Sequence, residues 1–305
     1  MLRWLCLMMG VCSLLHAQWD GPYENLKVLP EDIGKNELRD IMRQWSMDLG
    51  VRCTHCHATP TGKFEDIDFA SDDRKPKKIA REMLKMTRAV NKDFFKPHDK
   101  EISCYTCHHG TTDPRPLETI LRAGYDEGGI DQLEKTYREK RKTYHGAGAY
   151  NFKPWSALSV VANSLLPNEN WPDLKKIHLL NLEFNPDYDG SHFFLGAYYL
   201  DVEINETLAR DHLTAAMRSN AFWTPRKSAR LAKKWAHQQK SEAAERLLRM
   251  MVAVAPNHAD THANLGIYLK INGRMEEAGQ ALQKALSLKP DHPAAKPALA
   301  EMEQK

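Results

Sequence analysis

The pattern that most constrains this 305-residue chain is a five-residue motif that occurs twice, at residues 53–57 and 104–108. Each copy has the form Cys-x-x-Cys-His, which is the attachment signal of a c-type haem. The two thiols can add to the vinyl groups on one edge of a porphyrin, and the adjoining histidine then supplies an axial nitrogen to the iron. The sequence therefore predicts two covalently bound haem c groups. The expected attachment residues are Cys53, Cys56, Cys104 and Cys107, and the expected axial histidines are His57 and His108.

Other uses of paired cysteines fit this spacing less well. The pairs of a four-cysteine zinc site usually lie about fifteen to twenty residues apart, whereas 47 residues separate Cys56 from Cys104. A thioredoxin-like motif requires a βαβ setting, and the residues around Cys53 do not alternate like a strand. A disulfide across so short a span is strained. Haem attachment remains the interpretation that also explains the histidine after each pair.

The first seventeen residues have the pattern of a secretory leader. Arg3 gives a short basic start, residues 4–15 form an apolar run, and Ala17 precedes a cleavage point. The run is short for a membrane span. We therefore expect residues 1–17 to be a signal peptide and the chain to be exported to the periplasm or outer surface of a bacterium. A lipid anchor on Cys12 is the alternative, and the exact cleavage site stays open.

The composition limits the kinds of binding partner that we expect for this chain. The net charge is +3 at pH 7 and the mean hydropathy is −0.59, an ordinary balance for a chain in water. Such a balance argues against nucleic acid or a strongly anionic surface as an obligatory partner. No segment after the leader is apolar for long enough to span a membrane. We therefore expect protein partners.

An amphipathic helix is predicted before each motif. Apolar residues recur at helical spacing over residues 36–49, which Gly50 ends, and again over residues 76–91. Pro76 suits the first turn of the second helix, and Asp72 or Asp73 is expected to cap it. The first apolar stripe contains Leu38, Ile41, Met42, Trp45 and Leu49, and the second contains Ile79, Met83, Met86 and Val90. A unit of helix, turn and motif thus occurs twice in succession.

The two helices also offer candidates for the sixth ligand of each iron. Met42 lies eleven residues before Cys53, and Met83 lies twenty-one residues before Cys104. A thioether is a neutral donor that raises the reduction potential relative to a second histidine. A methionine on an apolar stripe can equally be core filler. Spacing alone leaves both roles open. The competing methionines are Met47 and Met86.

Residues 38–110 resemble the cytochrome subunit of the bacterial photosynthetic reaction centre. The matching segments are residues 42–45, 50–57, 69–72, 80–91 and 104–110. The resemblance implies that Met42 and Met83 are the axial methionines of the first and second haem. That family carries four haems in two such halves, and this chain has one half. His98 lies near a family histidine that reaches a haem of the other half. Here we expect it to be a solvated loop residue, and the alternative is that it ligates a haem of a second copy.

The second helix is strongly basic. Residues 74–88 hold seven Lys or Arg residues against the single acid Glu82. A solvated helix face explains such a run. The functional alternative is that Lys77 and Arg81 neutralise haem propionates or steer an acidic redox partner.

The carboxyl-terminal half has a repeat of about 34 residues, the length of a tetratricopeptide unit. Residues 259–292 fit this pattern best, with Leu265, Gly266, Ala278, Leu282 and Pro290 in the expected places. Three further copies precede it. This half resembles tetratricopeptide repeat proteins, which implies an α-solenoid that docks a protein partner. The array could instead pack on the haem domain or on another copy of itself.

The sequence thus predicts a mainly α chain in which a small dihaem c-type cytochrome domain precedes an α-solenoid. We expect the cytochrome domain over residues 18–120, a partly helical linker over 121–154, and about four helix pairs with a terminal helix over 155–305. The expected function is single-electron transfer between redox proteins, without enzymatic chemistry. The alternatives are a peroxidase-like haem enzyme with one open iron, and a building block of a conductive multi-haem assembly.

Overall fold

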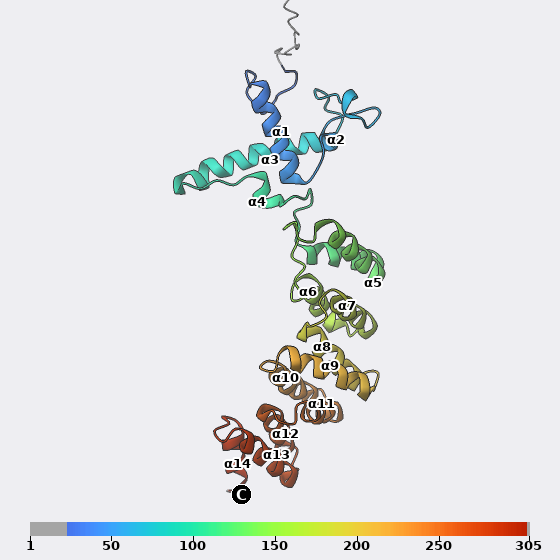
Figure 1. Cartoon of the computed structure of the whole chain (residues 1–305), viewed down its shortest axis with the longest axis vertical. Helices are drawn as coiled ribbons and strands as arrows, with labels where there is room; N and C mark the ends of the chain where they lie inside the picture. The colour runs from blue at the N-terminus through green and yellow to red at the C-terminus, as the bar shows by residue number, and fades with distance from the viewer. Residues whose placement is uncertain (1–22, 304–305) are drawn as a thin grey trace, which may run out of the picture. The chain divides into compact units, whose positions relative to one another are not determined.

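The computed structural model describes residues 23–303 (Figure 1). The expected signal peptide and Cys12 lie outside the described residues. The described residues form two compact units: an amino-terminal unit of residues 23–114 and 147–149, and a carboxyl-terminal unit of residues 115–146 and 150–303. Within 23–303 the regular elements are helical, apart from one isolated bridge between Ala58 and Asp68. The predicted mainly α fold class is confirmed.

Each motif of the amino-terminal unit follows a longer helix, as the sequence predicts. Gly50 ends α1 with a φ of +64°, and its Cα lies so close to the next motif that an added Cβ would be 2.1 Å from the carbonyl oxygen of Gly110. Only glycine meets both conditions. The elements are α1 (Lys35–Leu49), α2 (Cys53–Cys56), η1 (Phe64–Asp66), α3 (Lys75–Val90), the π-helical turn η2 (Asn91–Phe95), η3 (Lys96–His98) and α4 (Cys104–His108).

The start of α3 differs from the expected cap. Its N-cap residue is Arg74, which has no side-chain capping bond, and Pro76 lies in the first turn. The prediction that Asp72 or Asp73 caps this helix was wrong. Asp72 instead forms ion pairs with Lys27 and Arg81. Residue spacing along the sequence does not reveal these ion pairs. Proline in the first turn lacks one of the N–H groups that a cap would satisfy.

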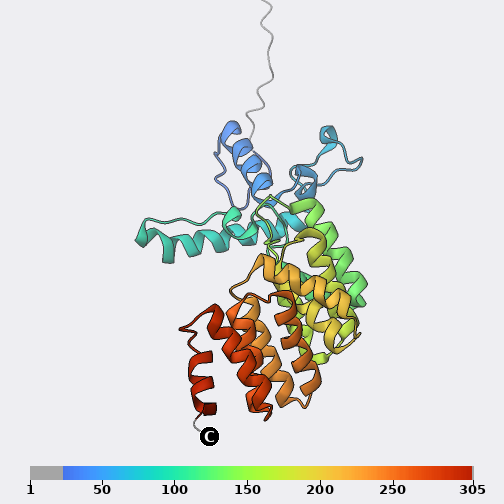
Figure 2. The same ribbon diagram turned by 60° about the horizontal axis from the view of Figure 1, so that its bottom comes forward.

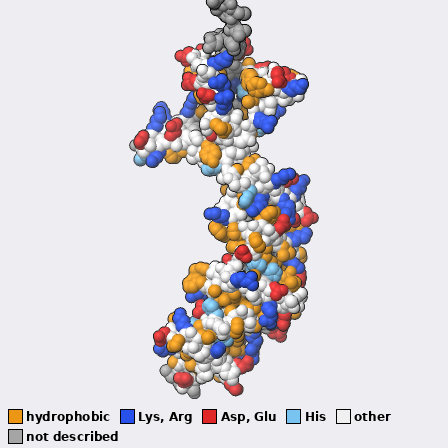
Figure 3. All heavy atoms as spheres, in the orientation of Figure 1, with side chains coloured by type: hydrophobic (Ala, Val, Ile, Leu, Met, Phe, Trp, Pro, Cys, Tyr) orange, Lys and Arg blue, Asp and Glu red, His pale blue; other side chains and the backbone are white. Residues whose placement is uncertain are grey.

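The amino-terminal unit buries little apolar side chain. Among its described residues, Ile33 is the one apolar side chain in the buried class, while Asp48, Asn91 and Thr111 are buried polar residues. The apolar stripe of α3 is instead open to solvent: the exposed fractions are 49% for Ile79, 38% for Met83 and 48% for Met86. Figure 3 shows apolar side chains on the surface of this unit among Lys and Arg. The other side chains of this unit therefore do not cover the apolar stripe of α3.

The carboxyl-terminal unit is a stack of helix pairs that lie beside their neighbours along the chain (Figures 1 and 2). These pairs occupy the stretches in which the 34-residue period occurs. The pairs are α6 (Ala157–Leu165) with α7 (Trp171–Phe184), α8 (Asp189–Asp201) with α9 (Glu206–Ser219), α10 (Thr224–His237) with α11 (Ser241–Val254), and α12 (Ala259–Ile271) with α13 (Met275–Leu288). The short η4 (Leu166–Asn168) joins the first pair, and α14 (Ala295–Glu303) follows the last.

The repeated small residues explain how paired helices approach. A Cβ added to Gly196 would lie 2.6 Å from Cγ of Leu213, and one added to Gly266 would lie 2.7 Å from Cγ of Leu282. Both leucines are fully buried. The first helix of a pair thus presents a backbone surface on which a leucine of the second helix packs, and this contact recurs in two repeats. The unit is an α-solenoid of the tetratricopeptide kind.

The boundary region differs from the expected linker over residues 121–154. Most of it is α5 (Leu117–Tyr144), which is broken by non-helical backbone at Gly128 and Gly129. A Cβ at Gly124 would lie 3.3 Å from Oγ1 of Thr136, so the two halves of α5 face each other like a further helix pair. Leu121, Leu133 and Tyr137 are almost fully buried. Because these side chains are buried, this segment belongs to the carboxyl-terminal unit. The prediction of a linker came from the glycines and charges of its sequence.

Candidate haem-binding site

The second motif presents its histidine with one ring nitrogen already bonded. Ser103 and Thr106 form a capping box that begins α4, and His108 is the last residue of this helix. The Nδ1 of His108 lies 2.9 Å from the carbonyl oxygen of Thr111. A neutral imidazole that donates from Nδ1 carries its lone pair on Nε2, the arrangement found in most metal-bound histidines. His108 is therefore oriented as an axial ligand would be.

The first motif is built on a shorter helix. The backbone N–H of His57 donates to the carbonyl of Cys53 at 3.0 Å and so closes α2. The Nδ1 of His57 is buried without a hydrogen-bond partner, and the ring meets Phe69 edge-on with centroids 5.0 Å apart. Burial lowers the pKa of His57, and the positive charge of Lys77 lowers it further. The imidazole is thus neutral at pH 7, the form that binds a metal.

The four cysteines of the motifs are free thiols. Burial is the main cause that raises the pKa of Cys56 and of Cys104, so these side chains are neutral thiols in the protein without its haems. Within the described residues, His, Cys, Asp and Glu side chains do not gather in groups of three or more that could hold a metal ion. The geometry expected of the zinc alternative is therefore missing in this part of the chain.

Met42 and Met83 occupy equivalent places in their helices. The hydroxyl of Ser46 donates to the carbonyl of Met42, and the hydroxyl of Thr87 donates to the carbonyl of Met83, both at 2.9 Å. Such bonds to the carbonyl four residues earlier bend a helix locally. The competing Met47 is 64% exposed and has no matching bond. In both helices the methionine is followed four residues later by Ser or Thr, a match that apolar periodicity does not register.

Each of the two long helices packs against the short helix of the motif that does not follow it directly. The helix of Met42, α1, packs against α4 of the second motif, and α3, which carries Met83, packs against α2 of the first. The backbone N–H of Gly110 donates to the carbonyl of Asp48 at 2.9 Å, which joins the end of α1 to the second motif. Each methionine helix thus touches the helix of the other motif, so the pairing of Met42 with the first haem and Met83 with the second rests on the resemblance.

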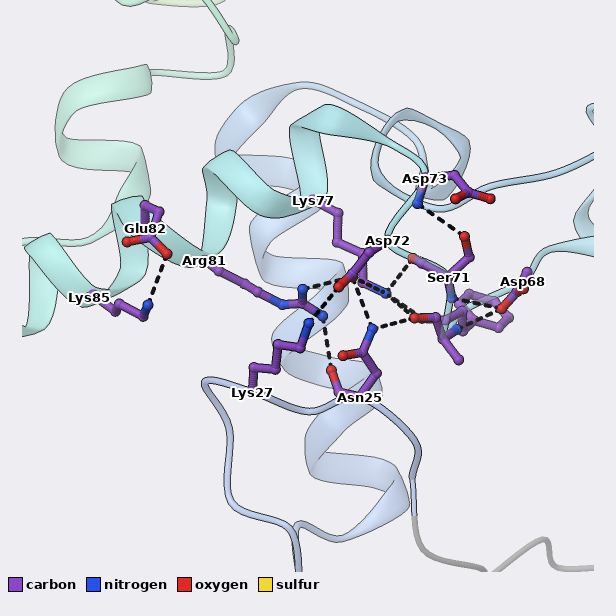
Figure 4. A network of polar contacts seen from close by, with 12 residues as sticks. Asn25, Lys27, Asp68, Ser71, Asp72, Asp73, Lys77, Arg81, Glu82 and Lys85 are labelled. Carbon is purple, nitrogen blue, oxygen red and sulfur yellow. Dashed lines mark hydrogen bonds and ion pairs between the residues drawn. The ribbon is translucent and has the colours of Figure 1, made fainter.

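A polar network ties two loops to α3 (Figure 4). Asp72 forms ion pairs with Lys27 and Arg81, both at 2.7 Å, and with Lys77 at 3.6 Å. Lys77 also donates to the carbonyl oxygens of Phe69, Ala70 and Ser71, while Arg81 donates to the carbonyl of Asn25. The side chains of Lys77 and Arg81 are only 12% exposed. These two cations are therefore engaged within the unit, and the simple alternative of a solvated helix face does not describe them.

This network predicts a loss of stability in acid. Hydrogen bonds from Lys27, and also from Arg81 and Asn25, hold the pKa of the Asp72 carboxyl well below its usual range. A lowered native pKa stabilises the fold above the unfolded pKa of about 4 and loses this effect as the pH falls. We expect Asp72→Asn to lower the urea midpoint of this unit at pH 7 and to reduce its further fall by pH 3. Asp73→Asn, at the exposed neighbour, is the control. Equal acid sensitivity of Asp72→Asn and the unchanged protein would refute this role.

The residues present fit two covalent haems. The unit supplies free thiols at the attachment spacing and a histidine after each pair. The open apolar stripe on α3 is a surface that a bound apolar ring system would cover. Cys53, Cys56, Cys104 and Cys107 would hold the porphyrin edges, and His57 and His108 would face the irons.

Comparison with known proteins agrees with this geometry. Residues 17–136 match the family model of the photosynthetic reaction centre cytochrome C subunit. This part of the chain is thus similar in sequence to the reaction-centre cytochrome c subunits. The photosynthetic reaction center cytochrome c subunit of Thermochromatium tepidum is 32% identical over 177 residues, which cover 54% of this chain and 42% of that protein. The chain thus spans less than half the length of this relative, and the amino-terminal unit is called the cytochrome unit below.

Solved structures similar to the chain are helical repeat proteins. The crystal structure of MamA has a TM-score of 0.28 and 16% identity, and covers 56% of this chain and 95% of its own. TTC0263, a tetratricopeptide repeat protein of Thermus thermophilus, has a TM-score of 0.28 and 19% identity, and covers 62% of this chain and all of its own. The repeat assignment therefore rests on the helix pairs described above. From residue 23 to residue 303, the chain contains no helix with the length and apolarity needed to cross a membrane.

Proposed function

We propose that this chain is an exported dihaem c-type cytochrome that carries single electrons between redox proteins and docks on a partner through its repeat unit. When bound, each haem supplies an iron that changes valence by one electron without making or breaking a bond to substrate. The observation that carries the proposal is the doubled unit of helix, methionine and motif, in which Met42 and Met83 have the same hydrogen-bonded setting.

The residues of the cytochrome unit have separate roles in this proposal. The four motif cysteines would hold the two haems covalently, while His57 with Met42 and His108 with Met83 would supply the ligands of the two irons. The carbonyl of Thr111 fixes the ring of His108. Six-coordinate iron leaves no open position for a substrate, which distinguishes an electron carrier from a peroxidase-like enzyme.

The repeat unit is proposed as the docking module. Stacked helix pairs present an extended surface on which a peptide or helix of a partner can lie. Several large apolar side chains of this unit are exposed, as expected of a surface that is covered in a complex. The most exposed of them are Ile271, Trp155, Phe222 and Ile204.

Replacement of the methionines tests the proposed ligation. We expect Met42→Ala and Met83→Ala each to convert one of two low-spin irons to a form that binds cyanide, and to remove about half of the weak near-infrared band of methionine–iron bonds. The matched control is Met86→Ala, which lies on the same apolar stripe and should leave both irons unchanged. Variants that keep two low-spin irons and an unchanged band would refute the ligation. Cyanide binding by one iron of the unchanged protein would favour the enzyme alternative.

A further inference from the structure

A hollow in the carboxyl-terminal unit is lined mainly by basic side chains. It lies where the last turns of α5 meet the end of α7, two helices that pack against each other. Its volume is about 320 Å³, and its lining residues are Arg138, Arg141, Lys142, His145 and Phe184. These residues all belong to the carboxyl-terminal unit. None of them takes part in the haem-binding site described above.

Aromatic side chains hold the guanidinium of Arg141 in place. Its Cζ lies 4.5 Å from the ring centroid of Phe184 and 5.6 Å from that of Phe152, distances at which a cation and an aromatic ring attract each other. Its Nη1 donates to the hydroxyl of Tyr137 at 3.3 Å. The ring of Tyr137 in turn packs against both phenylalanines, with centroids 5.8 and 5.7 Å apart. The side chain of Arg141 is therefore ordered before any partner binds.

In the described part of the chain, Arg141 lacks the acidic partners that its neighbour Arg138 has. Arg138 donates two hydrogen bonds to the carboxylate of Glu183, at 2.6 and 2.5 Å, and a third to Glu134 at 2.9 Å. Arg141 forms no ion pair with any residue between 23 and 303. Its bond to Tyr137 uses one of the five N–H groups of a guanidinium. The remaining N–H groups of Arg141 are thus available to a ligand.

The end of α5 explains the presence of cations here, but not the setting of Arg141. Arg141 and Lys142 lie in the last turn of this helix, where the carbonyl groups attract positive charge. That attraction does not require a guanidinium to lie against two aromatic rings. Lys142 is exposed and forms no ion pair within the described residues. A planar guanidinium held in this way suits bidentate hydrogen bonding to a carboxylate.

We infer that this hollow binds an acidic segment of a protein partner, with Arg141 bonded to one Asp or Glu carboxylate and Lys142 facing a second. The inference rests on the proposed docking role of the repeat unit and gives the chemistry of its partner. The charge of the hollow is complementary to such a segment. Because Arg141 is already ordered, binding loses little side-chain entropy. The hollow is open to solvent, so binding should weaken as the salt concentration rises.

A labelled oligoglutamate peptide with an amidated end tests this site on the exported full-length protein. We expect Arg141→Gln to weaken its binding about ten- to a hundredfold, the effect of losing hydrogen bonds to a charged group. Arg141→Lys keeps the charge without the planar guanidinium and should give a smaller loss. The matched control is Lys135→Gln, which removes one exposed charge from the same helix outside the hollow and should leave binding nearly unchanged. An oligoglutamine peptide should not bind.

Unfolding followed by circular dichroism shows whether Arg141→Gln still folds. If it does not, the exposed Lys142→Gln replaces it and should weaken binding severalfold. Equal binding by the hollow variant and Lys135→Gln would overturn this site, while leaving docking elsewhere on the repeat unit in place. Self-association of the unchanged protein that Arg141→Gln abolishes would overturn the partner in favour of a second copy. Fewer than two haems per chain, measured by haem absorbance, would instead refute the proposed function.

Discussion

The double replacement Cys53→Ala and Cys56→Ala is expected to remove one haem, to halve the haem absorbance per chain, and to destabilise the cytochrome unit. The physical reason is that this unit has one buried apolar side chain, Ile33, among its described residues. The ring system of a bound haem would supply the apolar contacts that the side chains of this unit lack. Its loss should cost at least about 3–5 kcal/mol, the cost of removing one large buried aromatic side chain.

Mass spectrometry and thermal unfolding check this prediction together. The mass of the exported variant should fall by one haem, and the unfolding signal of the cytochrome unit should move to lower temperature. His55→Ala replaces a residue at a variable position of the same motif, so it should keep both haems and serves as the control. A double variant that still carries two haems, or that unfolds like the unchanged protein, would show that these cysteines do not have the proposed role.

Leu213→Ala is expected to destabilise the repeat unit by about 2–5 kcal/mol, the range for removing a large buried aliphatic side chain. Leu213 on α9 is fully buried and lies where a Cβ on Gly196 would be 2.6 Å from its Cγ. Truncation leaves a cavity that the facing backbone of α8 cannot fill. Because repeats are stabilised by their immediate neighbours, the loss should spread along this unit.

Chemical unfolding followed by circular dichroism measures this effect, while haem absorbance follows the cytochrome unit separately. Leu208→Ala is the matched control, since Leu208 lies on the same helix and is 38% exposed. It should cost much less than Leu213→Ala. Similar losses from the two substitutions would contradict the close packing of α8 and α9.

The local parts of the fold could be predicted from the sequence because they depend on near neighbours. Apolar spacing gave α1 and α3 to within a residue or two, and Gly50 marked the end of α1. The 34-residue period located the helix pairs of the repeat unit. The burial of α5 could not be predicted in the same way, because Gly128 and Gly129 suggest a linker until Leu133 and Tyr137 are seen to be buried.

The candidate site likewise contains residues that the sequence predicts and contacts that it does not. The motif residues were evident because haem attachment fixes their spacing, and Met42 and Met83 came from the family resemblance. The roles of Asp72 and Lys77 and the join between α1 and the second motif depend on contacts between distant segments. Asp72 meets Lys27 across 45 residues, and the carbonyl of Asp48 meets Gly110 in the second motif. No periodic pattern encodes such contacts, so the Asp72 network and the join between α1 and the second motif required the structure.

The central claim is that this chain carries two covalent haems with closed coordination. The most direct measurement is the intact mass of the exported protein, combined with the spin state of its oxidised iron. The account predicts two haems per chain that survive denaturation, with both irons low-spin. One haem or none, or a high-spin iron in the unchanged protein, would contradict it.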